Sequence, residues 1–65
     1  MTKISLKAAR VNAGFSQKDA AVLLQISNKT LSSWEKGDTF PSAKMIECLC
    51  KLYKVSYDDI IFLPE

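Results

Sequence analysis

The chain contains no histidine, and only two cysteines, two glycines and two prolines stand among its 65 residues. Without histidine it lacks the commonest general base and the commonest zinc ligand. Cys48 and Cys50 are too few for a four-ligand metal site, and their spacing of two residues makes their side chains diverge on a helix. We therefore expect no metal, no cofactor and no internal disulfide, with both thiols reduced.

Long apolar runs are also absent, and the longest, residues 20–24, has five residues. A membrane span needs about 20 apolar residues, and the apolar region of a signal peptide needs about 7–15. We expect neither, and hence no membrane partner and a cytoplasmic location. A domain of this length is a poor host for the deep pocket that an enzyme needs, so we expect a binding module without catalytic residues or a small-molecule substrate.

The charge of the chain is unevenly distributed, although its formal net value is only +2. Residues 1–45 hold seven basic and three acidic side chains, whereas residues 46–65 hold two basic and four acidic ones. Such an asymmetry suits a protein that turns one face to a polyanion such as nucleic acid. A mixed, solvated surface would give a similar total, so charge alone does not decide between the two.

The spacing of the apolar residues predicts short helices rather than strands. The first helix covers about residues 4–13 and is followed by Gly14, which suits a left-handed C-terminal cap. The second helix, residues 17–24, begins after Ser16, and Asp19 completes a capping-box pattern with that serine.

Three further helices follow in the same way. The third covers residues 28–36, after an N-cap at Ser27 or Asn28, and ends at Gly37. The fourth runs from the cap Ser42 to about residue 53.

The C-terminal end repeats the capping-box pattern that begins the second helix. Ser56 and Asp59 predict a fifth helix through Phe62, which Pro64 ends. The sequence therefore predicts an all-α fold of five helices, forming a single domain over residues 1–65.

The second and third helices together, about residues 17–36, have the packing pattern of a helix-turn-helix. Ala21 is small where the two helices would cross, and Ile26 fills the angle between them. Leu31 and Trp34 hold the third helix to the core, so its outer face is free to enter a DNA major groove. A solvated helix face would also be polar, so these residues alone do not decide. The outward residues are Asn28, Lys29, Thr30, Ser32 and Ser33.

The stretch from Leu6 to Phe62 resembles the Cro/CI-type (lambda-repressor-like) helix-turn-helix family of phage and bacterial regulators. The resemblance rests above all on the block S-N-K-T-L-S-S-W-E-K-G, residues 27–37, with S-Q-K-D-A-A upstream at residues 16–21. Further matching residues are Leu6, Arg10, Gly14, Ile26, Pro41, Ser42, Leu49, Cys50, Val55, Ser56, Asp59 and Ile60. The family implies a five-helix domain that binds operator DNA, usually as a dimer, to control transcription.

The resemblance also implies roles for single residues. Arg10 and Glu35 match the family's paired positions, and we expect them to form a partly buried ion pair between the first helix and the end of the third. Expected to read bases are Asn28, Lys29 and Ser33. Expected to contact a base or the backbone are Thr30 and Ser32. Expected from the resemblance to contact DNA phosphates are Gln17, Lys36 and the main-chain amides near Thr39 and Phe40. We add Lys18 and Lys44 to this set, because they are cations beside the motif.

The chain departs from the family pattern at several positions, including Ala20, where leucine is common. Gln25 stands in the turn where the family often has glycine, so we expect it to adopt a left-handed conformation at a cost of about 1 kcal/mol. Val22 and Leu23 occupy positions that are usually charged. They are either scattered surface residues or a contact surface for a protein partner.

We interpret the chain as a sequence-specific transcriptional regulator of the phage or prophage repressor type, acting on nucleoid DNA in a bacterial or phage-infected cell. We expect a homodimer, at least on DNA, that pairs through the apolar end formed by Ile61, Phe62 and Leu63. The alternative is a protein-interaction module that keeps the fold but not the DNA contacts, with Val22 and Leu23 as its surface.

Overall fold

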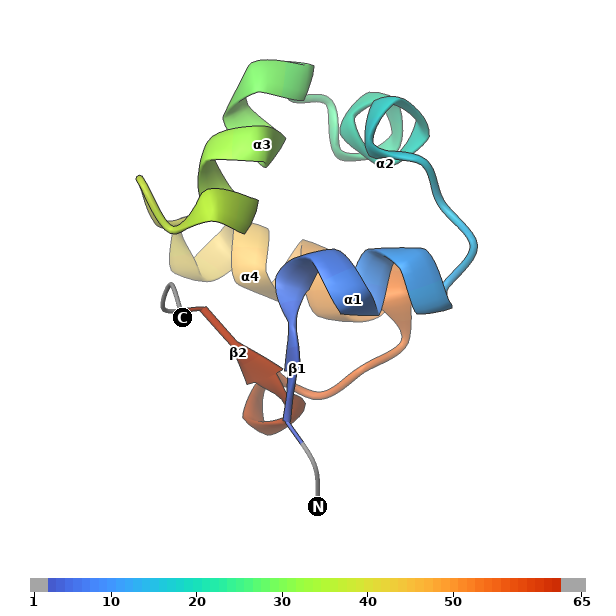
Figure 1. Cartoon of the computed structure of the whole chain (residues 1–65), viewed down its shortest axis with the longest axis vertical. Coiled ribbons are helices and arrows are strands. Elements are labelled where there is room, and N and C mark those ends of the chain that lie inside the picture. The colour runs from blue at the N-terminus through green and yellow to red at the C-terminus, as the bar shows by residue number, and fades with distance from the viewer. Residues whose placement is uncertain (1–2, 63–65) are drawn as a thin grey trace.

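The computed structural model describes residues 3–62. Within that range it contains four α-helices, one 3-10 turn and a two-stranded parallel sheet (Figure 1). In chain order the elements are β1 (Ile4–Ser5), α1 (Leu6–Asn12), α2 (Gln17–Leu24), α3 (Asn28–Lys36), α4 (Ala43–Tyr53), η1 (Tyr57–Asp59) and β2 (Ile60–Ile61). No helix in this range is long and apolar enough to cross a membrane.

Each of the α-helices begins after a serine whose side chain accepts a hydrogen bond from the backbone amide three residues further on. Such a cap satisfies an amide that the helix leaves unpaired, and its loss costs about 1 kcal/mol. The caps expected at Ser16 and Ser42 are confirmed, and Ser27 rather than Asn28 caps α3. The four caps are Ser5, Ser16, Ser27 and Ser42, with oxygen-to-nitrogen distances of 3.0, 3.0, 3.0 and 3.3 Å.

The α-helices end close to residues in the left-handed conformation. Gly14 and Gly37 have φ angles of 88° and 81°, which glycine adopts without the steric penalty of a Cβ. Gln25 ends α2 with a φ of 59° and a ψ of 41°, which confirms the conformation expected there. Lys54 ends α4 in the same way with a φ of 57°, and no turn signal in the sequence indicated this.

The prediction of a fifth helix near the C-terminus is wrong. Ser56 is followed by the single 3-10 turn η1, and its hydroxyl donates to the Asp59 carboxylate at 3.3 Å instead of capping a backbone amide. The chain then forms β2, in which Ile60 lies opposite Ile4 of β1 in a parallel pair. Two consecutive β-branched isoleucines favour an extended backbone, and pairing with β1 buries Ile60 to 6% exposure.

The N-terminal boundary of the first helix also differs from the expected one. The helix starts at Leu6 because Ser5 caps it and Ile4 belongs to β1. Leu63 and Pro64, which the sequence placed at the end of the fifth helix, lie outside the described residues.

The buried side chains form one core cluster between the helices and the small sheet, and α4 passes behind α1 in the view of Figure 1. Ala20 and Ala21 are almost completely buried, so α2 can approach α3 closely, and Ile26 packs against the edge of the core. This packing holds α3 from one side only and leaves its other face free. The core residues are Leu6, Ala9, Ala20, Ala21, Leu31, Trp34, Leu49, Tyr53 and Ile60.

Candidate nucleic-acid interface

The helices α2 and α3 meet at a steep angle through a short turn. In Figure 1, α2 is seen end-on while α3 is seen from the side. The backbone amides of Gln25 and Ile26 donate to Val22 and Ala21 at 3.1 and 3.0 Å, so the left-handed Gln25 closes α2 and redirects the chain. The result is a helix-turn-helix over residues 17–36.

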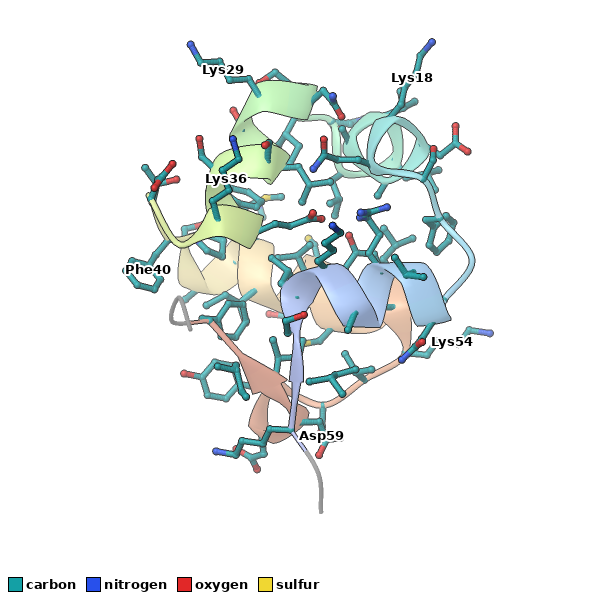
Figure 2. All side chains as sticks on the ribbon, in the orientation of Figure 1. Lys18, Lys29, Lys36, Phe40, Lys54 and Asp59 are labelled. Carbon is teal, nitrogen blue, oxygen red and sulfur yellow. The ribbon has the colours of Figure 1, made fainter. Side chains whose placement is uncertain are left out.

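The outer face of α3 carries the polar residues expected from the sequence. Asn28 and Lys29 are exposed at its first turn, and Lys29 points away from the body of the protein in Figure 2. Ser32 and Ser33 are half-buried. The Thr30 hydroxyl lies 2.8 Å from the hydroxyl of the capping serine, so the start of the helix already uses part of its hydrogen-bonding capacity.

An ion pair between α1 and α3 fixes the base of this helix. Arg10 Nε lies 2.8 Å from Glu35 Oε2, and the two side chains are 9% and 5% exposed. Arg10 Nη2 lies 3.5 Å from Glu35 Oε1, and Nη1 donates to the Phe15 carbonyl at 2.9 Å. The pair expected from the family positions is therefore present, and α1 and the loop before α2 hold it in place.

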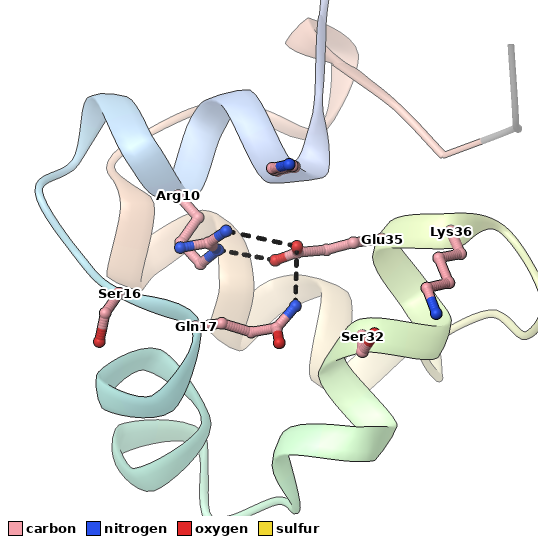
Figure 3. Close-up of a pocket in the computed structure, with 7 residues that line it drawn as sticks. Arg10, Ser16, Gln17, Ser32, Glu35 and Lys36 are labelled. Atoms are coloured by element: carbon pink, nitrogen blue, oxygen red, sulfur yellow. Dashed lines mark hydrogen bonds and ion pairs between the residues drawn. The ribbon is translucent and has the colours of Figure 1, made fainter.

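Gln17 belongs to the same network, which sequence reasoning missed. Its side-chain amide donates to Glu35 Oε1 at 3.1 Å, as the dashed line in Figure 3 shows. The two residues are 18 positions apart, so no local pattern links them. One amide hydrogen of Gln17 makes this bond, and its second hydrogen stays available for another acceptor.

Above this network lies an open cleft of about 440 Å³ between α1, α2 and α3 (Figure 3). It brings together Gln17, Ser32 and Lys36, three of the residues expected to contact DNA, and it adds Lys7, which the sequence did not single out. A lysine in the first turn of a helix has no distinguishing local signal, so only the fold reveals its place. The lining residues are Lys7, Arg10, Ser16, Gln17, Ser32, Glu35 and Lys36.

The remaining residues expected to contact phosphate are spread around this region and do not line the cleft. Lys18 is exposed on α2 and points outward in Figure 2. Lys44 is exposed at the start of α4, and Thr39 and Phe40 are exposed in the loop that follows α3. The side chain of Phe40 lines a second cleft, which also includes Tyr57.

Two ionisable side chains in or near the core have shifted pKa values. Burial first, and the Glu35 carboxylate second, raise the pKa of Tyr53 to about 12, while the Arg10 guanidinium acts in the opposite direction. Burial also raises the pKa of the Cys50 thiol. Cys48 and Cys50 are both free thiols, and residues 3–62 contain no group of three His, Cys, Asp or Glu side chains that could hold a metal ion.

A steep two-helix unit with a polar, outward second helix defines a helix-turn-helix domain. Residues 6–60 match the family model described as helix-turn-helix, and the chain belongs to this Cro/CI-type family. The match covers both helices of the motif and most of the elements that support them.

Several curated proteins are similar to the chain. The HTH-type transcriptional regulator ImmR of Bacillus subtilis (strain 168) is 41% identical over 60 residues, which are 92% of this chain and 47% of ImmR. The HTH-type transcriptional regulator DicA of Escherichia coli (strain K12) is 33% identical over 60 residues, 92% of this chain and 44% of DicA. YgzD of Bacillus subtilis (strain 168), an uncharacterized HTH-type transcriptional regulator, is 29% identical over 63 residues, which are 97% of this chain and 96% of YgzD. The chain thus spans about half the length of ImmR and DicA.

Proposed function

We propose that the chain is a sequence-specific DNA-binding regulator of transcription, without enzymatic activity, of the phage or prophage repressor type. The observation that carries the proposal is the arrangement of α3. Leu31 and Trp34 bury one side of this helix, the Arg10–Glu35 pair anchors its end, and the opposite side presents compact polar groups. ImmR and DicA are named as transcriptional regulators, and these names support the same class of function.

In this proposal, α3 enters the major groove of double-stranded operator DNA. Asn28 suits an adenine edge, Lys29 suits a guanine edge or a phosphate, and Ser33 accepts from or donates to several base edges. Thr30 and Ser32 contact a base or the backbone. Loss of one base contact costs about 1–3 kcal/mol and relaxes the preference at that position only.

Phosphate contacts around α3 set its register on the duplex. We propose that Lys18, Lys36 and Lys44 supply cations and that the side chain of Gln17 supplies a neutral donor. The main-chain amides near Thr39 and Phe40 lie in the exposed loop after α3 and complete the set.

We further propose that two copies pair on a two-fold operator through an apolar end surface, defined as Phe40, Ile46, Tyr57, Ile61 and Phe62. These side chains line one cleft. Three of them, Phe40, Tyr57 and Ile61, are large hydrophobic side chains exposed to solvent. Pairing on a two-fold operator requires a self-complementary patch, and this apolar surface is the one that we propose for it. The surface is built from α4, the loop before it, η1 and β2 rather than from a fifth helix, and Leu63 of the expected patch lies outside the described residues.

Selection of bound sites from random duplexes tests the function directly. We expect enrichment of two related half-sites whose centres lie about 34–36 Å apart. Alanine variants of Asn28, Lys29 and Ser33 should each relax the selected sequence at one or two base pairs. If all three variants keep the wild-type preference, α3 is not the reading helix.

The second candidate function is a protein-interaction module that does not bind DNA. Val22 and Leu23 favour it, because they are 68% and 57% exposed on adjacent positions of α2. The absence of DNA binding at low salt, together with loss of a protein partner in a Val22→Lys variant, would support this candidate over DNA binding.

A further inference from the structure

The cleft between α1, α2 and α3 contains a cation that the proposed DNA contacts do not use. Lys7 is exposed in the first turn of α1, and its side chain lines the cleft opposite residues of α2 and α3. Lys36 lines the same cleft from the last turn of α3. Two lysines from helices far apart in the sequence therefore share one open space.

Among residues 3–62, the acidic residue that lines this cleft is Glu35, and its charge is already compensated. Its two oxygens accept hydrogen bonds from Arg10 and Gln17, and its side chain is only 5% exposed. The carboxylate is thus buried and paired, while Lys7 and Lys36 line the same cleft and are exposed. In the described part of the chain, the lining carries three cations and one anion, so it attracts a negatively charged ligand.

The neutral side chains of the cleft suit an anionic oxygen acceptor. Gln17 uses one amide hydrogen for Glu35 and has a second one to donate. The Ser16 hydroxyl accepts from the backbone amide of Asp19, which leaves its own hydrogen free. The Ser32 hydroxyl adds a third donor from α3.

We infer that this cleft receives one phosphate of the DNA backbone and that Lys7 is a ligand of that phosphate. The inference rests on the proposed DNA binding and names a contact beyond those proposed above. Because Lys7 and Arg10 lie one turn apart on α1, one short helix would both bind the phosphate and anchor α3. The backbone contact and the angle of the reading helix would then be set by the same element.

The test combines a protein variant with neutral replacement of single phosphates. A duplex obtained by site selection is prepared with a methylphosphonate at one backbone position at a time, and binding is measured at fixed low salt. We expect one position in each half-site at which the replacement weakens wild-type binding by about tenfold. Lys7→Gln should weaken binding to the unmodified duplex to a similar extent, and the methylphosphonate at that position should not weaken its binding further.

Lys54→Gln is the matched control, because it removes the same charge from a lysine at the end of α4, away from Lys29 and Lys36 in Figure 2. This variant should stay sensitive to every phosphate to which the wild type is sensitive. If Lys7→Gln also keeps the full wild-type pattern while the wild type binds DNA, the inference is wrong and the proposed function stands. If the wild type binds no duplex, the proposed function itself fails.

A titration with inorganic phosphate separates a backbone contact from a site for a small free anion. Nuclear magnetic resonance signals of the Gln17 and Ser32 amides should shift only at millimolar phosphate, and the selected duplex should displace the anion. Micromolar binding of inorganic phosphate that persists in the DNA complex would identify a small-anion site and overturn the inference.

Discussion

Arg10 joins three parts of the fold through its guanidinium group. It bonds Glu35 at the end of α3 and the Phe15 carbonyl in the loop before α2, while its own backbone belongs to α1. The Arg10–Glu35 pair could be predicted because both residues stand at paired positions of a known family. The contacts of Phe15 and Gln17 could not, because they depend on how the loop after Gly14 turns back across α1.

Replacement of Arg10 by alanine should destabilise the fold strongly. Glu35 would keep a buried charge without its partner, which costs about 3–5 kcal/mol in the free energy of unfolding. Lys51→Ala is the control, because Lys51 pairs with Glu47 at 3.2 Å where both side chains are largely exposed. That variant should lose at most about 0.5 kcal/mol. Urea denaturation measures both, and a loss below 1 kcal/mol for Arg10→Ala would show that the pair contributes little.

The hydroxyl of Tyr53 is buried without a hydrogen-bond partner among the described residues. Tyr53→Phe removes this group and should leave stability at pH 7 unchanged or raise it by about 1 kcal/mol. The raised pKa of about 12 also predicts an alkaline effect. The folded protein keeps the phenol proton to higher pH than the unfolded chain, whose tyrosines ionise near pH 10, so this stabilisation is present below pH 10 and is lost as the pH rises toward 12.

Denaturant unfolding at pH 9, 10, 11 and 12 measures this effect. Wild type should become progressively less stable than Tyr53→Phe over this range. Tyr57→Phe alters an exposed tyrosine, 59% accessible, and should follow the wild-type curve. Parallel curves for wild type and Tyr53→Phe would contradict the alkaline prediction.

At the level of the elements, α2, α3 and α4 were predictable because each has a serine cap at its start, whereas α1 was found from its apolar spacing and Gly14, and its start was placed two residues too early. A serine cap and an apolar face at helical spacing locate a helix without knowledge of the rest of the fold. The pairing of β1 with β2 was not predictable, since Ile4 and Ile60 lie 56 positions apart and each strand has only two residues. Ser56 and Asp59 imitate a capping box, but the tertiary pairing of Ile60 overrides that local pattern.

The turn of the helix-turn-helix carries a strain that one substitution should relieve. Gln25 adopts a φ of 59°. In this left-handed conformation, a residue with a Cβ has a steric penalty of about 1–2 kcal/mol that glycine does not have. After the larger backbone entropy of glycine in the unfolded chain is subtracted, Gln25→Gly should stabilise the domain by roughly 0.5–1 kcal/mol. Calorimetry should show a higher Tm, and an unchanged or lower Tm would mean that the Gln25 side chain makes a stabilising contact.

Gly14→Ala provides the reverse test at the end of α1. A Cβ added to Gly14 would meet no heavy atom within 4 Å, so only the backbone conformation, with a φ of 88°, opposes the change. We expect a loss of about 1 kcal/mol in the free energy of unfolding.

For the whole molecule, the two proposed surfaces meet at the loop after α3 and at α4. The DNA contacts come from α2, α3, the main chain of that loop and Lys44 of α4, whereas the apolar end surface comes from the Phe40 side chain in the same loop and from α4, η1 and residues 61–62. Sequence periodicity finds the face of α3, but it does not reveal a surface assembled from a loop, a turn and a strand. Only Ile61 and Phe62 of the apolar end surface were expected as a pairing patch, and they were expected on a helix.

Disruption of the apolar end surface should weaken pairing without changing contacts within a half-site. Ile61→Lys places a charge on β2 where a second copy would pack, and two copies would meet with like charges. Binding to a full two-fold duplex should therefore lose cooperativity, while binding to a duplex with one half-site stays the same. Val11→Lys, on an exposed valine of α1, is the control. Equal cooperativity in Ile61→Lys and the wild type would exclude this pairing surface.

The salt dependence of binding tests the electrostatics of the whole molecule. If Lys18, Lys36 and Lys44 each meet a phosphate, a dimer neutralises about six, and log K against log salt should have a slope near −5. Lys7 would bring the slope to about −7 if the cleft holds a further phosphate. The affinity of the wild type for DNA should then fall at least about a thousandfold between 50 and 200 mM salt. Lys36→Ala should reduce the slope by about one unit for each subunit bound. Asp58→Asn on η1 should leave the slope unchanged, because Asp58 is exposed and is not among the proposed DNA contacts. A slope near zero in the wild type would instead favour the protein-interaction module, because a surface that releases no counterions is not bound to a phosphate backbone.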